Sequence, residues 1–350
     1  MTTSSDDGED DERDDGAAER DDGERIAAKR DESRPAARGG KRAGKRIRRS
    51  TGGMLREPRT PLKDRLPTMR DRLTTVDRLR RRTVASDQVP IHGSHARAQP
   101  DHGDPSGRRV LGDRFRLVCW NIEDGLDVAG AIEALTGHPN LRDADAICLQ
   151  EMDPGGVERI ALTLNLNFFY LESSKDERSE RGFGNAILSP WPLSDHVTAP
   201  LPHVAKAYGR PRAAIGATVN PTTTGDPAPF AVWSVHAEIP SLSLSRRVAQ
   251  YTAIAAKAAA ANPRHLLIAG DFNTTTATSV LALDELYGLF DLDRLTAPAG
   301  PSLRRAGRLF RLDHIYGRGV DVAAVGIERE VIASDHWPVW IEIGVRPTGG

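Results

Sequence analysis

Acidic, amide and imidazole side chains directly follow apolar runs in the C-terminal part of the chain. Asp271 and Asn273 follow the run 266–269, and Asp335 and His336 follow a second apolar stretch. Short apolar runs of this kind predict buried strands, so each pair is expected where a strand ends. Polar side chains gathered at one end of a sheet are typical of an active site.

Two earlier apolar runs end in the same way. Asn121 follows the run 117–120, and Gln150 and Glu151 follow the run 146–149. With the later pairs they supply carboxylate and amide oxygens, which are the ligands that Mg²⁺ prefers, and an imidazole that could act as a general base. These residues predict a metal-dependent hydrolase.

Charge is unevenly distributed along the 350 residues, although the net charge is only −1. Residues 1–24 hold about a dozen acids and two arginines, whereas residues 25–85 hold 21 Lys and Arg against six acids. The only two cysteines, Cys119 and Cys148, lie in apolar runs, which predicts buried, reduced thiols and favours the cytoplasm. No run reaches the roughly 18 apolar residues of a transmembrane helix, and the acidic N-terminus lacks the apolar region of a secretory signal.

The N-terminal third is predicted to lie outside the catalytic fold. Residues 1–60 are charged and nearly free of aromatics, so we expect a disordered tail. Residues 61–112 are interpreted as a basic arm, with a short amphipathic helix over 69–82 and a linker over 84–112. Such a helix either packs on the domain or stands alone, or it binds a nucleic acid, an anionic membrane surface or a protein partner.

Residues 113–346 have the composition of a single globular domain of the α/β class. Strands and helices are expected to alternate along it, which favours layered packing. Strands are predicted near 115–120, 146–150, 184–189, 213–219, 230–235, 265–269, 312–316 and 337–344. Helices are predicted near 127–136, 156–164, 243–261 and 279–288, and Asn262-Pro263 is expected to end the third of them.

Seven short motifs occur along this domain, and their order is more specific than any one of them. They are Trp120-Asn121-Ile122-Glu123, Leu149-Gln150-Glu151, Gly182-Phe183-Gly184-Asn185, Ser234-Val235-His236, Gly270-Asp271-Phe272-Asn273, Leu312-Asp313-His314 and Ser334-Asp335-His336. In this order they resemble the endonuclease/exonuclease/phosphatase superfamily, the DNase I-like phosphoesterases. The resemblance implies a four-layer sandwich of two packed β-sheets flanked by helices.

The resemblance and the residue types together predict a metal site. Glu151 is the strongest candidate ligand, and Asp335 and Glu123 are expected to bind directly or through water. Asn121 is expected to orient Glu151 or a metal-bound water and is counted with the residues of the metal site. Asp124 is as well placed as Glu123. Mg²⁺ is the expected ion, with Mn²⁺ as the alternative.

A second group of residues is predicted to carry out the chemistry. His336 is the expected general base, because an ordinary imidazole titrates near neutral pH, and Asp313 is expected to orient it. Asp271 would position the nucleophile or assist the leaving oxygen, and Asn273 would hydrogen-bond a phosphoryl oxygen. His236 is expected to be a cation that stabilises charge on the phosphoryl group, with a structural core histidine as the alternative.

Other residues near the motifs have less specific signals. Arg210 and Arg212 either contact substrate phosphate or are solvated loop residues. His314 is expected to be structural, and Trp191 and Trp337 are expected to pack rather than to stack on bases.

The leading functional prediction is Mg²⁺-dependent hydrolysis of a phosphodiester, with DNA or RNA bound through the basic arm. The first alternative is hydrolysis of an inositol phosphate or a phospholipid headgroup, with peripheral contact to an anionic membrane. A catalytically inactive binding protein on the same fold is the other alternative.

Overall fold

The computed structural model describes residues 94–97, 110–175, 181–206, 210–222 and 229–344. The chain divides into two units, Met1–Pro61 and Leu62–Gly350. The first unit, and with it the predicted tail, lies outside the described residues, as does the predicted helix 69–82. No helix among the described residues is long and apolar enough to cross a membrane.

The described part of the second unit contains two mixed β-sheets. The larger has the order β1-β4-β5-β3-β2-β15-β14, and the smaller has the order β10-β13-β9-β8-β7-β6. The strands of the larger sheet are β1 (Ser94–Arg97), β2 (Arg114–Asn121), β3 (Ala146–Met152), β4 (Asn167–Lys175), β5 (Gly182–Ser189), β14 (Asp321–Ile327) and β15 (Val339–Gly344). Those of the smaller sheet are β6 (Leu193–Pro200), β7 (Ala213–Val219), β8 (Phe230–His236), β9 (His265–Asp271), β10 (Asp293–Arg294) and β13 (Asp313–Arg318). A separate hairpin is formed by β11 (Leu303–Arg305) and β12 (Arg308–Phe310).

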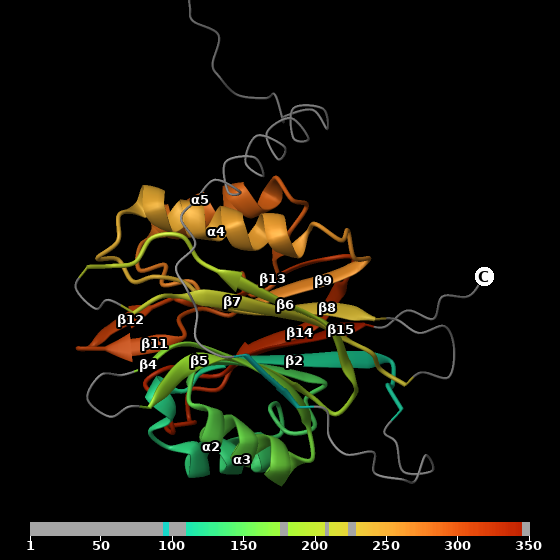
Figure 1. Cartoon of the computed structure of the whole chain (residues 1–350). Coiled ribbons are helices and arrows are strands. Elements are labelled where there is room, and N and C mark those ends of the chain that lie inside the picture. The colour runs from blue at the N-terminus through green and yellow to red at the C-terminus, as the bar shows by residue number, and fades with distance from the viewer. Residues whose placement is uncertain (1–93, 98–109, 176–180, 207–209, 223–228, 345–350) are drawn as a thin grey trace, which may run out of the picture. The chain divides into compact units, whose positions relative to one another are not determined.

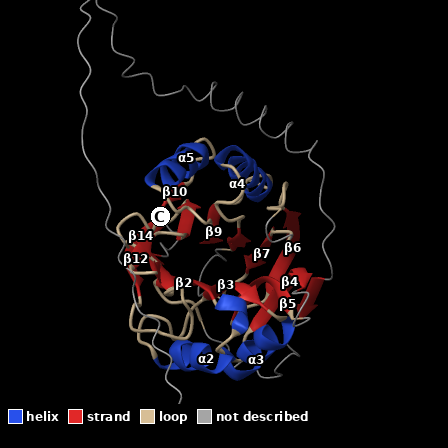
Figure 2. Ribbon diagram, turned by 90° about the vertical axis from the view of Figure 1, so that its left-hand side faces the viewer, coloured by secondary structure: helices blue, strands red, loops and turns tan. Residues whose placement is uncertain are grey.

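Helices cover the outer face of each sheet, which gives four layers (Figures 1 and 2). The helices α2 (Val128–Gly137) and α3 (Pro154–Leu164) pack on the larger sheet, and α4 (Leu244–Ala258) and α5 (Ala277–Gly288) pack on the smaller one. Local signals define their ends: Asp153 caps α3 by accepting from the backbone of Gly156, and Thr276 and Ser279 form a capping box at α5. The predicted four-layer α/β sandwich is confirmed.

The space between the sheets is filled by apolar side chains from both of them. Phe115 stacks on Phe230 with ring centroids 4.1 Å apart, and Trp191 stacks on Phe115 with ring centroids 6.4 Å apart. Trp191 is therefore a core residue, as predicted. Because side chains of both sheets interdigitate in this layer, the ends of their strands are held in a fixed relation to one another.

The strands and helices predicted within residues 113–346 all occur, with ends that differ by a few residues. The third helix, predicted over 243–261, ends at Ala258 because the chain turns before Asn262, which has a φ of 46°. Strands β4, β6 and β14 were not predicted, since their mixture of polar and apolar residues gives weak alternation. The segment 84–112, predicted to be a linker, contains the short strand β1, which pairs with β4.

Candidate active site

Strand pairing brings the predicted residues together at one end of the two sheets. In the larger sheet β2 and β3 are parallel, and Asn121 is the register partner of Gln150, which precedes Glu151. In the smaller sheet β8 and β9 are parallel, and Asp271 is the register partner of His236 on one side and of Asp313 on the other. Each sheet thus contributes two adjacent parallel strands whose carboxyl ends carry polar groups.

Several of these polar residues have left-handed backbone conformations. The φ angles are 43° at Glu123, 57° at Glu151 and 52° at Asn273. Such angles are unfavourable for residues other than glycine and persist where surrounding contacts fix them. Here the fixing contacts come from the site itself, because Asn121 Oδ1 accepts from the backbone N–H of Glu123 (3.1 Å) and Asp271 Oδ1 accepts from that of Asn273 (2.8 Å).

The amide of Asn121 connects the contributions of the two sheets. Its Nδ2 donates to Glu151 Oε1 and to Asp271 Oδ2, both at 3.2 Å. The other oxygen of Glu151 accepts from the backbone N–H of Asp124 at 3.3 Å. The carboxylate of Glu151 is therefore oriented from two directions and is connected to the Asp271 side chain through the Asn121 amide.

His336 is oriented by a buried carboxylate. Its Nδ1 lies 2.8 Å from Asp313 Oδ2, and the same oxygen accepts from the Ser302 hydroxyl at 2.6 Å. An ionised carboxylate only accepts hydrogen bonds, so the ring donates from Nδ1 and presents Nε2 to the site. Nε2 faces Asp271 Oδ2 and Asp335 Oδ1, each at 3.9 Å.

The charges around His336 determine its protonation. Burial alone lowers the pKa of His336, but the carboxylates of Asp313, Asp271 and Asp335 outweigh burial and raise this pKa to about 10. Burial and the neighbouring Asp313 raise the pKa of Asp271 to about 7. Because three carboxylates surround this imidazole, its pKa lies above that of the ordinary imidazole on which the predicted role as general base is based.

The second imidazole of the site, His236, has the opposite electrostatic environment. Arg212 Nη1 lies 3.0 Å from His236 Nε2 and 3.1 Å from Nδ1, and both side chains are buried. Burial lowers the pKa of His236 well below its usual value, and the positive charges of Arg212 and His336 lower it further. This environment disfavours the cationic form of His236, and Arg212 supplies a fixed positive charge beside the ring.

Glu151, Glu123 and Asp335 lie on the more open side of the site. The side chains of Glu151 and Asp335 are 21% and 37% exposed, and Glu123 Oε2 accepts from the backbone N–H of Asp335 at 3.0 Å. Burial raises the pKa of Glu151, because the charged carboxylate loses solvation, while the nearby Arg212 acts in the opposite direction. These three carboxylates do not form one of the tight three-residue groups found among the described residues, but Mg²⁺ retains several waters and needs few protein ligands.

The chain matches the model of the endonuclease/exonuclease/phosphatase family over residues 118–336. The chain belongs to this family. Its members hydrolyse phosphoester bonds and depend on a divalent metal, and the match includes the segments that carry the site described above. A comparison with curated proteins found no match.

Solved structures share the fold at low sequence identity. TDP2 of D. rerio, complexed with a single-strand DNA product, is 15% identical with a TM-score of 0.52, and the alignment covers 67% of this chain and 100% of that one. The human Nocturnin catalytic domain with bound sulfate is 16% identical with a TM-score of 0.53, covering 67% and 96%. A mannosyl-6-phosphatase of Bacteroides thetaiotaomicron is 17% identical with a TM-score of 0.50, covering 66% and 100%. These neighbours establish the fold of this family member but not its substrate.

Three polar residues of the site gave no specific sequence signal. Arg212 also lies 3.5 Å from Glu238 Oε1, and Glu238 is buried and accepts from the backbone of Ala205 and Ile239. Ser302 holds Asp313 from a loop that precedes it. Polar residues of these types are common in loops. Only the fold shows that Arg212, Glu238 and Ser302 are buried against site residues.

The hydrogen bonds and ion pairs of Asn273, His314 and Arg210 show how each side chain is held beside the site. Asn273 donates from Nδ2 to the carbonyl of Ala237 at 3.0 Å, so part of its amide serves the fold. His314 is buried, contacts Thr274 at 2.6 Å and has a pKa lowered to about 3 by burial, in agreement with a structural role. Arg210 forms an ion pair with Asp124 at 3.3 Å, which connects two loops beside the site.

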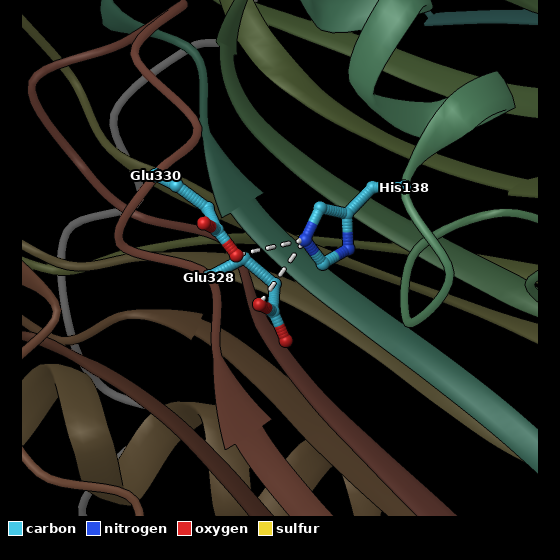
Figure 3. Close-up of side chains that lie close together, drawn as sticks. All are labelled: His138, Glu328 and Glu330. Carbon is cyan, nitrogen blue, oxygen red and sulfur yellow. Dashed lines mark ion pairs between the residues drawn. The ribbon is translucent and has the colours of Figure 1, made fainter.

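A second group of histidine and carboxylate side chains lies near the C-terminal end of α2 (Figure 3). His138 Nε2 lies 3.3 Å from Glu328 Oε2 and 3.6 Å from Glu330 Oε1. The backbone N–H of Asn140 donates to His138 Nδ1, so in the neutral ring the proton lies on Nε2, which faces the two carboxylates. Glu328 Oε1 accepts from Asn140 and Trp340, so this cluster is a set of hydrogen bonds that connects α2 to the segment after β14.

Proposed function

We propose that this protein hydrolyses phosphodiester bonds with the help of Mg²⁺, with Mn²⁺ as the alternative ion. The observation that supports this most is the link through Asn121 between Glu151, a metal-ligand candidate, and Asp271, which faces His336. Metal ligand, nucleophile-positioning acid and base are thereby adjacent, as in-line displacement at phosphorus requires.

The donor set fits a hard divalent cation. Glu151, Glu123 and Asp335 would hold it, with Asn121 orienting Glu151 or contributing its amide oxygen. The three carboxylates are oxygen donors on the more open side of the site, where the ion can keep water ligands. When bound, the cation would offset negative charge on the phosphoryl oxygens and lower the pKa of His336 toward neutral pH.

The residues of the chain supply the remaining parts of the reaction. A water held by Asp271 attacks phosphorus while its proton passes to Nε2 of His336, and the P–O bond to the leaving group breaks. Asp313 stabilises the imidazolium that results, because its carboxylate accepts from Nδ1 at 2.8 Å. Asn273 donates to a phosphoryl oxygen with the amide hydrogen that Ala237 does not use.

Charge stabilisation is shared by the residues around His236. The neutral His236 ring donates one hydrogen bond to the phosphoryl group, and Arg212 beside it provides the fixed positive charge. Arg212 and Arg210 lie against the ring of Phe183, with guanidinium carbons 4.8 and 4.9 Å from its centroid. The Phe183 ring thereby limits how far either guanidinium can move.

Nucleic acid is the proposed substrate class, and the basic residues 25–85 support it. Clustered Lys and Arg bind phosphate backbones independently of sequence. These residues lie outside the described part of the structure, so the proposal rests on their composition. Removing residues 1–100 should weaken DNA binding and flatten its dependence on salt; unchanged binding would exclude a role for the arm. A cytoplasmic location is part of the proposal, supported by the two buried free cysteines.

A substrate panel tests the proposed function. Plasmid DNA, RNA, an inositol phosphate and a phospholipid are each incubated with Mg²⁺ and the wild-type protein or His336→Ala. We expect cleavage of a nucleic acid that is lost in His336→Ala. Cleavage of only the inositol phosphate or the lipid would replace the substrate class. Binding without any cleavage would favour a non-catalytic protein on this fold.

A further inference from the structure

The β11–β12 hairpin is attached directly to the His336 and Asp313 pair. Leu303 forms an isolated β-bridge with His336, and Trp337 donates its backbone N–H to the carbonyl of Ser302 at 2.7 Å. The hydroxyl of Ser302 also holds Asp313. Figure 1 shows the hairpin projecting at the end of the sheets. Whatever the hairpin binds therefore lies next to the proposed general base.

The hairpin presents a concentration of positive charge. Arg304, Arg305 and Arg308 are exposed, and residues 294–312 contain five arginines and no acid. Within the described ranges none of these three has a carboxylate within ion-pair distance. Arg311 differs from them, because it donates to backbone carbonyls of the preceding loop.

The positive charges of the hairpin arginines reduce its stability. Arg305 and Arg308 are direct cross-strand partners, and like charges in that arrangement are destabilising. The strands join through Ala306 and Gly307, with φ angles of 49° and 73°, and such a turn favours glycine or asparagine at both positions. A two-stranded ribbon is also marginal by itself. A bound polyanion would offset the repulsion between the arginines.

Arg329 extends the positive surface toward the site. Its guanidinium carbon lies 5.6 Å from the centroid of the half-buried Trp337 ring, and Trp337 follows His336 in the chain. Arg329 has no ion-pair partner among the described residues. An aromatic ring with an arginine beside a phosphate-binding surface suits an unpaired base.

We propose that the hairpin arginines Arg304, Arg305 and Arg308 bind the phosphate backbone of a nucleic acid strand beside the phosphate that is cleaved. The inference rests on the proposed function and extends it to the residues that bind the nucleic acid strand. Arg305 lies two residues beyond Leu303, about 7 Å further along the strand from the residue that pairs with His336. A polymer places further phosphates along the ribbon, and the arginine fork binds them bidentately.

A bilayer surface is the less suitable partner. The hairpin has one large exposed apolar side chain, Leu309, which is 58% exposed, while its other exposed side chains are three arginines and an alanine. Insertion into a membrane requires an apolar face rather than one leucine. The distribution of charge therefore favours a strand with regularly spaced phosphates.

The test compares two triple variants of the full chain that remove the same charge. Arg304→Gln, Arg305→Gln and Arg308→Gln are combined in one protein, and Arg142→Gln, Arg159→Gln and Arg246→Gln, exposed arginines on the helical layers, in the other. Binding of a fluorescent single-stranded oligonucleotide is measured in EDTA, so that no cleavage is needed. Hydrolysis of bis(p-nitrophenyl) phosphate with Mg²⁺ is measured separately.

We expect the hairpin triple to weaken oligonucleotide binding at least ten-fold and to reduce the slope of log affinity against log salt by about 2. Hydrolysis of bis(p-nitrophenyl) phosphate should stay unchanged, and the helical-layer triple should bind nearly as the wild type does. Replacing the three hairpin arginines with lysine should restore the slope if the loss comes from charge and not from unfolding of the hairpin.

Other outcomes separate this inference from the proposed function. Equal binding losses in the two Gln triples, or none in either, would overturn the hairpin inference even if bis(p-nitrophenyl) phosphate is hydrolysed. Oligonucleotide binding that depends on the hairpin in a protein without hydrolytic activity would support the inference and reject the proposed function. Loss of binding to phosphatidylserine vesicles without loss of oligonucleotide binding would assign the hairpin to membranes and overturn the inference.

Discussion

The segment between β14 and β15 contributes to a cluster of histidine and carboxylate side chains at each of its two ends. Glu328 and Glu330, at its start, contact His138, whereas His336, at its end, contacts Asp313 and faces Asp271. In the first cluster Nδ1 accepts a backbone N–H, and Nε2 faces Glu328 at 3.3 Å and Glu330 at 3.6 Å. In the second cluster Nδ1 donates to a carboxylate, and Nε2 faces other groups at 3.9 Å without a direct hydrogen bond.

This difference shows what distinguishes a structural cluster from a reactive one of the same composition. In a neutral imidazole, the hydrogen bond made by one ring nitrogen determines whether the other nitrogen is a donor or an acceptor. His138 has both nitrogens committed to the fold, while His336 has one nitrogen held and one presented to the site. Residue types alone do not separate the two clusters; their hydrogen bonds do.

The largest expected effect is on catalysis at the second cluster. Asp313→Asn keeps the shape of the side chain but removes the charge that holds His336, so kcat/KM should fall by roughly 10³–10⁴-fold. His138→Gln should leave kcat/KM unchanged. Hydrolysis of bis(p-nitrophenyl) phosphate by both variants measures the contrast. A similar loss in both would mean that the two clusters do not differ as described.

The next effect is on stability at the first cluster. Glu328→Ala leaves Trp340 Nε1 and the Asn140 amide without an acceptor, which should reduce the free energy of unfolding by about 2 kcal/mol. Glu330→Ala, at a side chain that is 80% exposed, is the control and should cost less than about 0.5 kcal/mol. Urea unfolding measures both values. If the two variants are equally stable, Glu328 does not hold the segment after β14.

A smaller effect on catalysis is expected from Ser302, which holds Asp313 of the second cluster. Ser302→Ala removes the hydroxyl that holds Asp313 at 2.6 Å, so kcat should fall about ten-fold with little change in KM. Ser243→Ala, at an exposed serine before α4, is the control and should match the wild type. Steady-state kinetics with thermal unfolding of each variant measure the effect. A rise in KM alone would place Ser302 in substrate binding instead.

The sequence predicted the scaffold of the site because each contributing strand is a continuous apolar run. The runs that end at Asn121 and Asp271 were recognisable without any tertiary information, and the family motifs supplied their order. The match of the family over residues 118–336 and the four layers of the fold agree with that reading. The roles of the individual site residues remain predictions.

The electrostatics of the site could not be predicted in the same way. The pKa of His336 depends on carboxylates from three separate segments, and that of His236 depends on Arg212, which was indistinguishable from a solvated loop arginine. The hairpin also gave no signal, since its strands are three residues each and its polar residues resemble a loop. These properties arise only when the two sheets pack together.

The most direct test of the account is the Mg²⁺ dependence of bis(p-nitrophenyl) phosphate hydrolysis by the wild type, Glu151→Gln and His138→Gln. The account predicts that EDTA abolishes the wild-type rate and that added Mg²⁺ restores it. Glu151→Gln should require far more Mg²⁺ or stay inactive, while His138→Gln should follow the wild-type curve. Hydrolysis that survives EDTA, or a wild-type Mg²⁺ curve in Glu151→Gln, would contradict the proposed metal site.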